Sequence, residues 1–204
     1  MSNLKYGAIG ALGLALMFNL TSASAQEVAR IRGTIEKVDG NTLAVKSREG
    51  QNLTIKLKDG ATITGVDKAM LSDIKQNSFI GITAMPQPDG TQKAIEVHIF
   101  PESMRGTGEG HYDWDLKPNT KMTNANVEQT VGGVDGPVLT VKYKDGEKKV
   151  LVTPETAVVT YVIGDKADLK PGTKIFVGAA KKGADGTWQT PRVTYGKDGL
   201  TPPM

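Results

Sequence analysis

The sequence contains one pattern twice, and this repetition constrains the fold more than any other feature. The first copy opens with Val38-Asp39-Gly40 and ends near Phe100, and the second opens with Val134-Asp135-Gly136 and ends near Gly196. The shared residues are mostly turn formers and strand cores, so they specify a fold rather than a chemistry. Further matches at the same spacing are Leu43/Leu139, Val45/Val141, Lys46/Lys142, Gly50/Gly146, Asp89/Asp185, Gly90/Gly186, Thr91/Thr187 and Val97/Val193.

Within each copy, short stretches of alternating apolar residues are separated by turn signals. Leu53, Ile55 and Leu57 lie two apart, which is the period of a half-buried strand. Asp39-Gly40 and Asp59-Gly60 predict turns, because glycine accepts the positive φ that a tight turn needs. Several short strands at this spacing predict a small β-barrel. In the first copy the expected strands cover 29–38, 42–46, 53–57, 62–64, 79–85 and 94–100, with a helical turn between 67 and 75.

Three stretches of the first copy carry a resemblance to a known family. They read GTIEKVDGNTLAVKSREGQNLTIKL, LSDIKQNSFIGITA and DGTQKAIEVHI. Together they resemble a widespread exported bacterial domain of unknown function, and the resemblance implies an OB-like β-barrel. The first copy departs from the family pattern where Gln76-Asn77 stands in place of the usual glycine, which the second copy keeps as Pro171-Gly172. The whole chain is also similar to two-repeat periplasmic proteins, some of which take their names from metal transport.

The repeat and the resemblance together predict an all-β chain with two tandem OB-like small β-barrels after a cleaved signal peptide. We expect the signal peptide over 1–25 and the first barrel over 26–100. A glycine-rich interdomain segment over 101–121 joins it to the second barrel over 122–197, and 198–204 form a C-terminal tail.

The first 25 residues have the features of an export signal. Lys5 is followed by an apolar stretch from Ala8 to Leu20 and by the small residues Ala23-Ser24-Ala25. This pattern is typical of a secretory signal peptide, and it is short for a membrane span. A permanent N-terminal anchor is the alternative. We therefore expect a periplasmic or secreted protein without a membrane span after cleavage.

Composition narrows the classes of partner and chemistry. The chain has no cysteine, which excludes disulfides, thiolate metal sites and thiol nucleophiles. The formal net charge is only +3, and removal of the signal peptide takes away Lys5. Such a balanced charge gives no reason to expect a nucleic-acid partner. We expect a monomer whose partner is an unidentified periplasmic protein or a small ligand.

The interdomain segment is the most distinctive unrepeated stretch, and it supplies the candidate site residues. Tyr112, Trp114 and Leu116 share one face of an extended chain, so an ordered linker would pack Trp114 between the barrels. The opposite parity carries an imidazole and two carboxylates, which could bind a divalent metal. The ligand or interface candidates are Arg105, His111, Tyr112 and Trp114, and the metal candidates are His111, Asp113 and Asp115.

These features favour a non-catalytic binding or interaction protein of the periplasm, without a cofactor. The alternative is an accessory protein that binds a divalent metal through the interdomain His/Asp segment. A hydrolase would need Ser103 with His111, but no nucleophile elbow surrounds Ser103. The other histidine, His98, lies on a strand face opposite Val97, and we expect it to be solvated.

Overall fold

The computed structural model describes residues 27–204, and the predicted signal peptide lies outside this range. The described chain is all-β: twelve strands form one continuous sheet, and its helical residues form four short 3-10 turns. The strands are β1 (Val28–Asp39), β2 (Thr42–Ser47), β3 (Asn52–Lys68), β4 (Phe79–Pro86), β5 (Gln92–Ile99), β6 (Gly110–Trp114), β7 (Thr120–Val131), β8 (Val138–Tyr143), β9 (Gly146–Leu151), β10 (Ala157–Ile163), β11 (Lys174–Lys182) and β12 (Trp188–Gly196).

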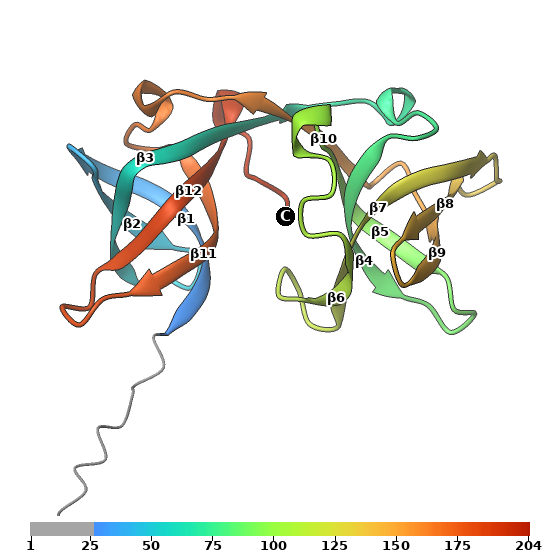
Figure 1. The fold of residues 1–204 in the computed structure, drawn as a ribbon, viewed down its shortest axis with the longest axis horizontal. Helices are drawn as coiled ribbons and strands as arrows, with labels where there is room; N and C mark the ends of the chain where they lie inside the picture. Colours follow the sequence, from blue (N-terminus) through green and yellow to red (C-terminus); the bar gives the residue numbers. More distant parts are fainter. Residues whose placement is uncertain (1–26) are drawn as a thin grey trace, which may run out of the picture.

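Five strands close into a mixed β-barrel, which we call the closed barrel. Its members are β1, β2, β3, β12 and β11, and β11 pairs back to β1 (Figure 1). Four of the five pairings are antiparallel, whereas β12 runs parallel to β3. The prediction of a β-barrel is therefore confirmed. The predicted Asp39-Gly40 turn is confirmed too, since Gly40 has a φ of +57° and Asp39 pairs with Thr42.

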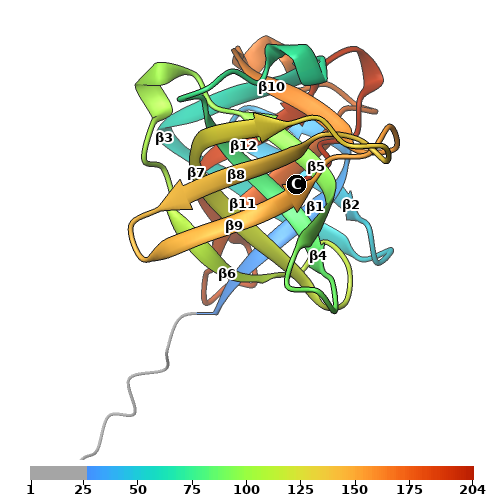
Figure 2. The same cartoon turned by 90° about the vertical axis from the view of Figure 1, so that its right-hand side faces the viewer.

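Six further strands form a second lobe beside the closed barrel, made of β4, β5, β7, β8 and β9 with β6 at its edge. β7 pairs with β4, β6 and β8, and β8 pairs with β9 (Figure 2). β5 pairs with β4 along its length and contacts β9 through the parallel pairs Gln92/Val150 and Lys93/Leu151. The 3-10 turn Glu102–Met104 leads from β5 toward β6.

Both lobes take strands from both halves of the sequence. The closed barrel joins β1–β3 to β11 and β12, although these strands belong to the two different predicted barrels, 26–100 and 122–197. The reason is the length of β3, whose seventeen residues span roughly 55 Å. β3 therefore carries the chain out of the closed barrel, and β4 pairs in the second lobe instead of with β1.

The Asp59-Gly60 turn that the sequence predicts is a bulge inside β3. Gly60 has a φ of +70°, yet the strand continues on both sides of it. On the neighbouring strand the register shifts between Thr190, opposite Leu57, and Arg192, opposite Thr62. The extra residues bend β3 without reversing it, as a β-bulge does.

Each lobe has its own hydrophobic core, and a third, smaller core joins them. The third core contains Val66, Val159, Phe176 and Met204. β10 runs across the junction, antiparallel to β3 and parallel to β5 (Figure 1). The C-terminus also lies between the two lobes in this view. Among the described residues, no helix is long and apolar enough to span a membrane.

Candidate functional site

A cavity of about 170 Å³ lies at the junction of the two lobes. Its walls come from the closed barrel, from the second lobe, from β10 and from the loop that precedes β6. The site therefore exists only because the lobes are packed together. The lining residues are Thr64, His98, Phe100, Met104, Thr107, Gly108, Tyr112, Trp114, Met122, Asn124, Tyr161, Phe176, Arg192, Thr194 and Met204.

Aromatic rings form much of the wall. Phe100 lies 4.8 Å from the His98 ring and 5.3 Å from the Tyr161 ring, measured between centroids. Trp114 lies 6.2 Å from Phe176 of β11, and its ring packs edge-on to Phe176. These distances are those of favourable aromatic pairs. The wall is therefore apolar and held by rings from both lobes.

A buried carboxylate orients the histidine of the cavity. Glu96 is fully buried and His98 is 3% exposed, and both lie on β5. His98 Nδ1 lies 3.1 Å from Glu96 Oε2, and Thr83 Oγ1 donates a 2.6 Å hydrogen bond to Glu96 Oε1. Because Nδ1 faces the carboxylate, Nε2 is left on the side of Gly81, where a Cβ atom would lie 2.0 Å from it.

Gly81 makes room for this histidine. A Cβ atom at position 81 would lie 2.0 Å from His98 Nε2 and 2.6 Å from Asn124 Oδ1. No side chain could occupy that space without displacing one of them. The absence of a side chain at Gly81 therefore brings the imidazole and the amide together on one wall.

Two buried polar atoms of the cavity have no hydrogen-bond partner among residues 27–204. They are Trp114 Nε1, which is a donor, and Asn124 Oδ1, which is an acceptor. The Asn124 amide group is fixed from its other end, since Nδ2 donates to Thr107 O at 3.1 Å and to Tyr112 Oη at 3.3 Å. Buried polar groups nearly always have a partner, and the other two such atoms among the described residues, Gln92 Oε1 and Thr153 Oγ1, lie away from this cavity.

The rim of the cavity is polar and includes one cationic side chain. Thr107, Gly108 and Arg192 are exposed, whereas Asn124 and Met122 are buried. Within the described part of the chain, the Arg192 guanidinium makes no hydrogen bond or ion pair. Burial raises the pKa of the nearby Tyr161 hydroxyl, helped by the charge of Glu96, and the positive charge of Arg192 opposes this shift.

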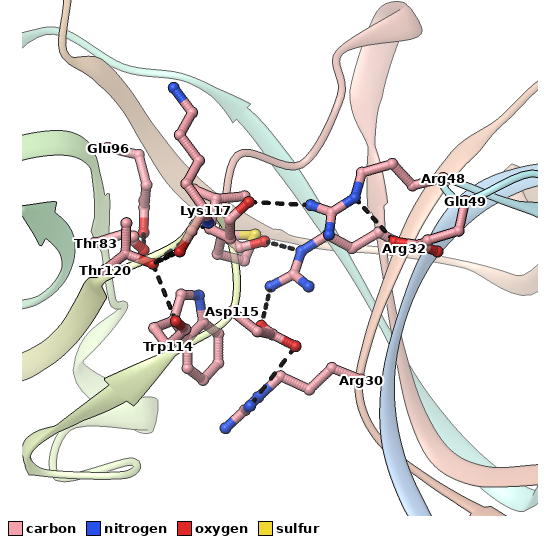
Figure 3. A network of polar contacts seen from close by, with 12 residues as sticks. Arg30, Arg32, Arg48, Glu49, Thr83, Glu96, Trp114, Asp115, Lys117 and Thr120 are labelled. Carbon is pink, nitrogen blue, oxygen red and sulfur yellow. Dashed lines mark hydrogen bonds and ion pairs between the residues drawn. The ribbon is translucent and has the colours of Figure 1, made fainter.

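Trp114 also anchors a polar network between the lobes. The Arg30 guanidinium lies 4.1 Å from the Trp114 ring centroid, within cation–π range. Arg32 donates to Asp115 Oδ1 at 2.8 Å (Figure 3). It also donates to Met204 O at 2.9 Å. Both arginines extend from β1 toward the segment after β6. The expected position of Trp114 between two lobes is therefore found, with the ring half-buried.

The three residues predicted to bind metal do not assemble. His111 Nδ1 contacts Thr123 Oγ1 at 2.8 Å, Asp113 pairs with Lys121, and Asp115 pairs with Arg32. Among residues 27–204, no group of three or more His, Asp or Glu side chains could hold a metal ion. Burial lowers the pKa of His111, and the charges of Lys148 and Lys121 lower it further.

Arg105 and Ser103 lie on the 3-10 turn region before β6. Arg105 donates to both Glu102 carboxylate oxygens, at 2.6 and 2.7 Å, and to Asn77 O at 2.9 Å. It ties this turn to the loop before β4. Ser103 is exposed and is not among the hydrogen-bond partners of His111 in the described structure. The pair that a hydrolase would need is therefore not formed.

Comparison of the chain with protein-family models, with curated proteins and with solved structures finds no match.

Sequence reasoning missed part of this site. His98 was expected to be solvated, and this is wrong. Its strand, β5, lies between β4 and β10, and the Phe100 and Tyr161 rings pack against the His98 ring. Glu96 was not singled out either. The signal that could have found them is their spacing, because Glu96 and His98 lie two apart on a strand and share a face.

Proposed function

We propose that this chain is an exported, non-catalytic binding protein whose ligand site is the junction cavity. One observation carries the proposal: the cavity wall holds an unpartnered donor, Trp114 Nε1, and an unpartnered acceptor, Asn124 Oδ1. Leaving a buried polar group without a partner costs about 1–3 kcal/mol. A ligand that satisfies both atoms recovers this free energy on binding.

The lining chemistry favours binding over catalysis. The hydroxyl groups that line the cavity belong to threonines and tyrosines, and His98 makes its described hydrogen bonds to Glu96 alone. Nucleophilic catalysis requires a nucleophile within hydrogen-bond reach of its base. The His98–Glu96 pair serves instead to hold the cavity wall in one arrangement.

Export and the double-barrel architecture belong to this proposal. The pattern of 1–25 supports export to the periplasm. The repeated sequence, the separate core of the second lobe and the β5–β9 pairs support the interpretation that the second lobe is a related barrel. On this view the two barrels exchange their last strands and create the ligand site at their contact.

Ligand-observed NMR with a library of ring-sized compounds tests the proposal. We expect hits whose signals are lost in Met104→Trp, because the larger side chain at the cavity wall occupies the ligand space. Met70→Trp is the matched control: Met70 is an exposed methionine away from the cavity, so hits should persist. If no compound binds, or if Met104→Trp leaves all binding intact, the cavity is not a ligand site.

A metal role has no comparable support, since His111, Asp113 and Asp115 have separate partners. Native mass spectrometry of protein purified without added metal tests this alternative. A bound ion that is lost in His111→Ala would favour it over the junction cavity.

A further inference from the structure

Resting on the proposed function, we infer that the cavity binds a small aromatic carboxylate that also carries a hydrogen-bond donor, such as a hydroxyl group on the ring. The aromatic body would fill the cavity, the ring hydroxyl would bind Asn124, and the carboxylate would face Trp114 and Arg192.

The size and walls of the cavity set the body of the ligand. The volume is about 170 Å³, and an apolar cavity of about 150 Å³ is enough for one benzene ring. The rings of Phe100, Tyr161, Trp114 and Phe176 supply faces and edges for stacking. A single six-membered ring therefore fits.

The unpartnered atoms set the polar groups. Trp114 Nε1 is a donor only, so it requires an acceptor on the ligand. Asn124 Oδ1 is an acceptor whose orientation is fixed by the two hydrogen bonds from Nδ2, and it lies over Gly81 beside the His98 ring, so a donor on the ligand would complete its hydrogen bonding. A carboxylate supplies the first group and a ring hydroxyl supplies the second.

The positive charge of Arg192 at the rim sets the sign of the ligand's charge. Arg192 lines the cavity, is exposed, and has no carboxylate partner among the described residues. The other arginines of the junction differ, since Arg30 and Arg32 are both paired with Asp115. An arginine without a partner at the mouth of an apolar cavity favours a carboxylate, with which it can form two parallel hydrogen bonds.

Isothermal titration with four probes tests the ligand class. The probes are 4-hydroxybenzoate, benzoate, 4-hydroxybenzyl alcohol and 4-hydroxybenzylamine. We expect 4-hydroxybenzoate to bind most tightly, benzoate to bind several-fold more weakly, and the alcohol to bind at least about tenfold more weakly. The amine should bind most weakly, because its charge has the same sign as Arg192.

Three variants separate the effect of the Arg192 charge from the effect of the cavity shape. Arg192→Gln should weaken 4-hydroxybenzoate at least about tenfold while it changes the affinity for the alcohol less than twofold. Trp114→Phe keeps a ring and removes the donor, so it should weaken both carboxylates. Lys181→Gln removes one positive charge from an exposed part of β11 and should leave every affinity unchanged.

The outcomes distinguish a wrong ligand class from a cavity that binds nothing. If the alcohol or the amine binds as tightly as 4-hydroxybenzoate, or if Arg192→Gln weakens all probes equally, the carboxylate assignment is wrong and the cavity remains a binding site. If none of the probes binds but other ring-sized compounds compete for the cavity, the assignment is also wrong. If nothing binds there at all, the proposed function fails with it.

Discussion

Asp115 accepts a 2.8 Å hydrogen bond from Arg32, and this contact joins β1 of the closed barrel to the segment that follows β6 of the second lobe (Figure 3). Arg30 lies 3.7 Å from the other carboxylate oxygen. The Asp115 carboxylate thus faces two arginines of β1, a strand that lies far earlier in the sequence. The contact is one of the polar links that hold the two lobes in register around the cavity.

Asp115→Asn should lower stability in a pH-dependent way. Burial raises the pKa of Asp115, but the Arg32 hydrogen bond and the charges of Arg32 and Arg30 outweigh it, so this pKa lies below its ordinary value. A carboxyl group with a lowered pKa stabilises the fold above its unfolded pKa of about 3.9, and this contribution is lost as the pH falls through the folded pKa. Because the side chain is 48% exposed, we expect only about 0.5–1 kcal/mol at pH 7.

Urea denaturation of both proteins at pH 7 and at pH 3 measures this difference. The gap in unfolding free energy should be largest at pH 7 and should shrink at pH 3. A gap that is the same at both pH values would mean that the Asp115 charge does not contribute.

Trp114→Ala should loosen the junction. The substitution removes the ring contacts with Arg30 and Phe176 and leaves space beside the third core. Because the ring is only half-buried, we expect a loss of about 2 kcal/mol, below the usual cost for a core tryptophan. Small-angle scattering should show a larger radius of gyration.

Tyr143→Ala is the control for this variant, since Tyr143 is a half-buried aromatic residue that packs within the second lobe. It should lower stability without changing the scattering. If Trp114→Ala alters neither stability nor scattering, Trp114 does not fix the lobes.

Gly81→Ala should be far more damaging than a typical Gly→Ala change. The new Cβ would meet His98 Nε2 at 2.0 Å and Asn124 Oδ1 at 2.6 Å, so both buried side chains must move. We expect a loss of about 2–3 kcal/mol from overpacking, together with loss of ligand binding. Gly178→Ala is the matched control, because its Cβ would make only ordinary contacts with Phe176 at 3.6 Å. Thermal melts that show equal losses for the two variants would contradict the packing argument.

A designed disulfide tests the exchange of strands between the halves. Thr34 of β1 pairs with Lys174 of β11, and antiparallel partners have Cα atoms about 4.5–5.5 Å apart, within disulfide range. Because the chain has no cysteine, Thr34→Cys with Lys174→Cys creates an isolated pair. Mass spectrometry after mild oxidation should find an intramolecular bond. A second double variant, Thr34→Cys with Phe79→Cys of β4, should not form an efficient bond. If it does, β1 pairs with β4 and each half of the chain closes on itself.

Local elements could be predicted from the sequence because their causes are local. Alternating apolar residues indicated the strands, and the Asp39-Gly40 turn follows from the freedom of glycine at positive φ. Asp59-Gly60 carries the same local signal but forms a bulge in β3. What differs is the pairing of β3 with β12, which comes from the other end of the chain and continues on both sides of the bulge, so β3 bends there without reversing.

The sequence by itself determined that this chain is all-β and where most of its strands lie. Only the tertiary structure decided which strands share a lobe, and that His98, Asn124 and Arg192 meet at one cavity. Equivalent strands of the two halves have similar apolar patterns. The alternation of apolar and polar residues therefore specifies which face of a strand is buried, but it does not specify the strand with which it pairs. Pairing is settled by long-range packing, and the site follows from it because its walls come from both lobes.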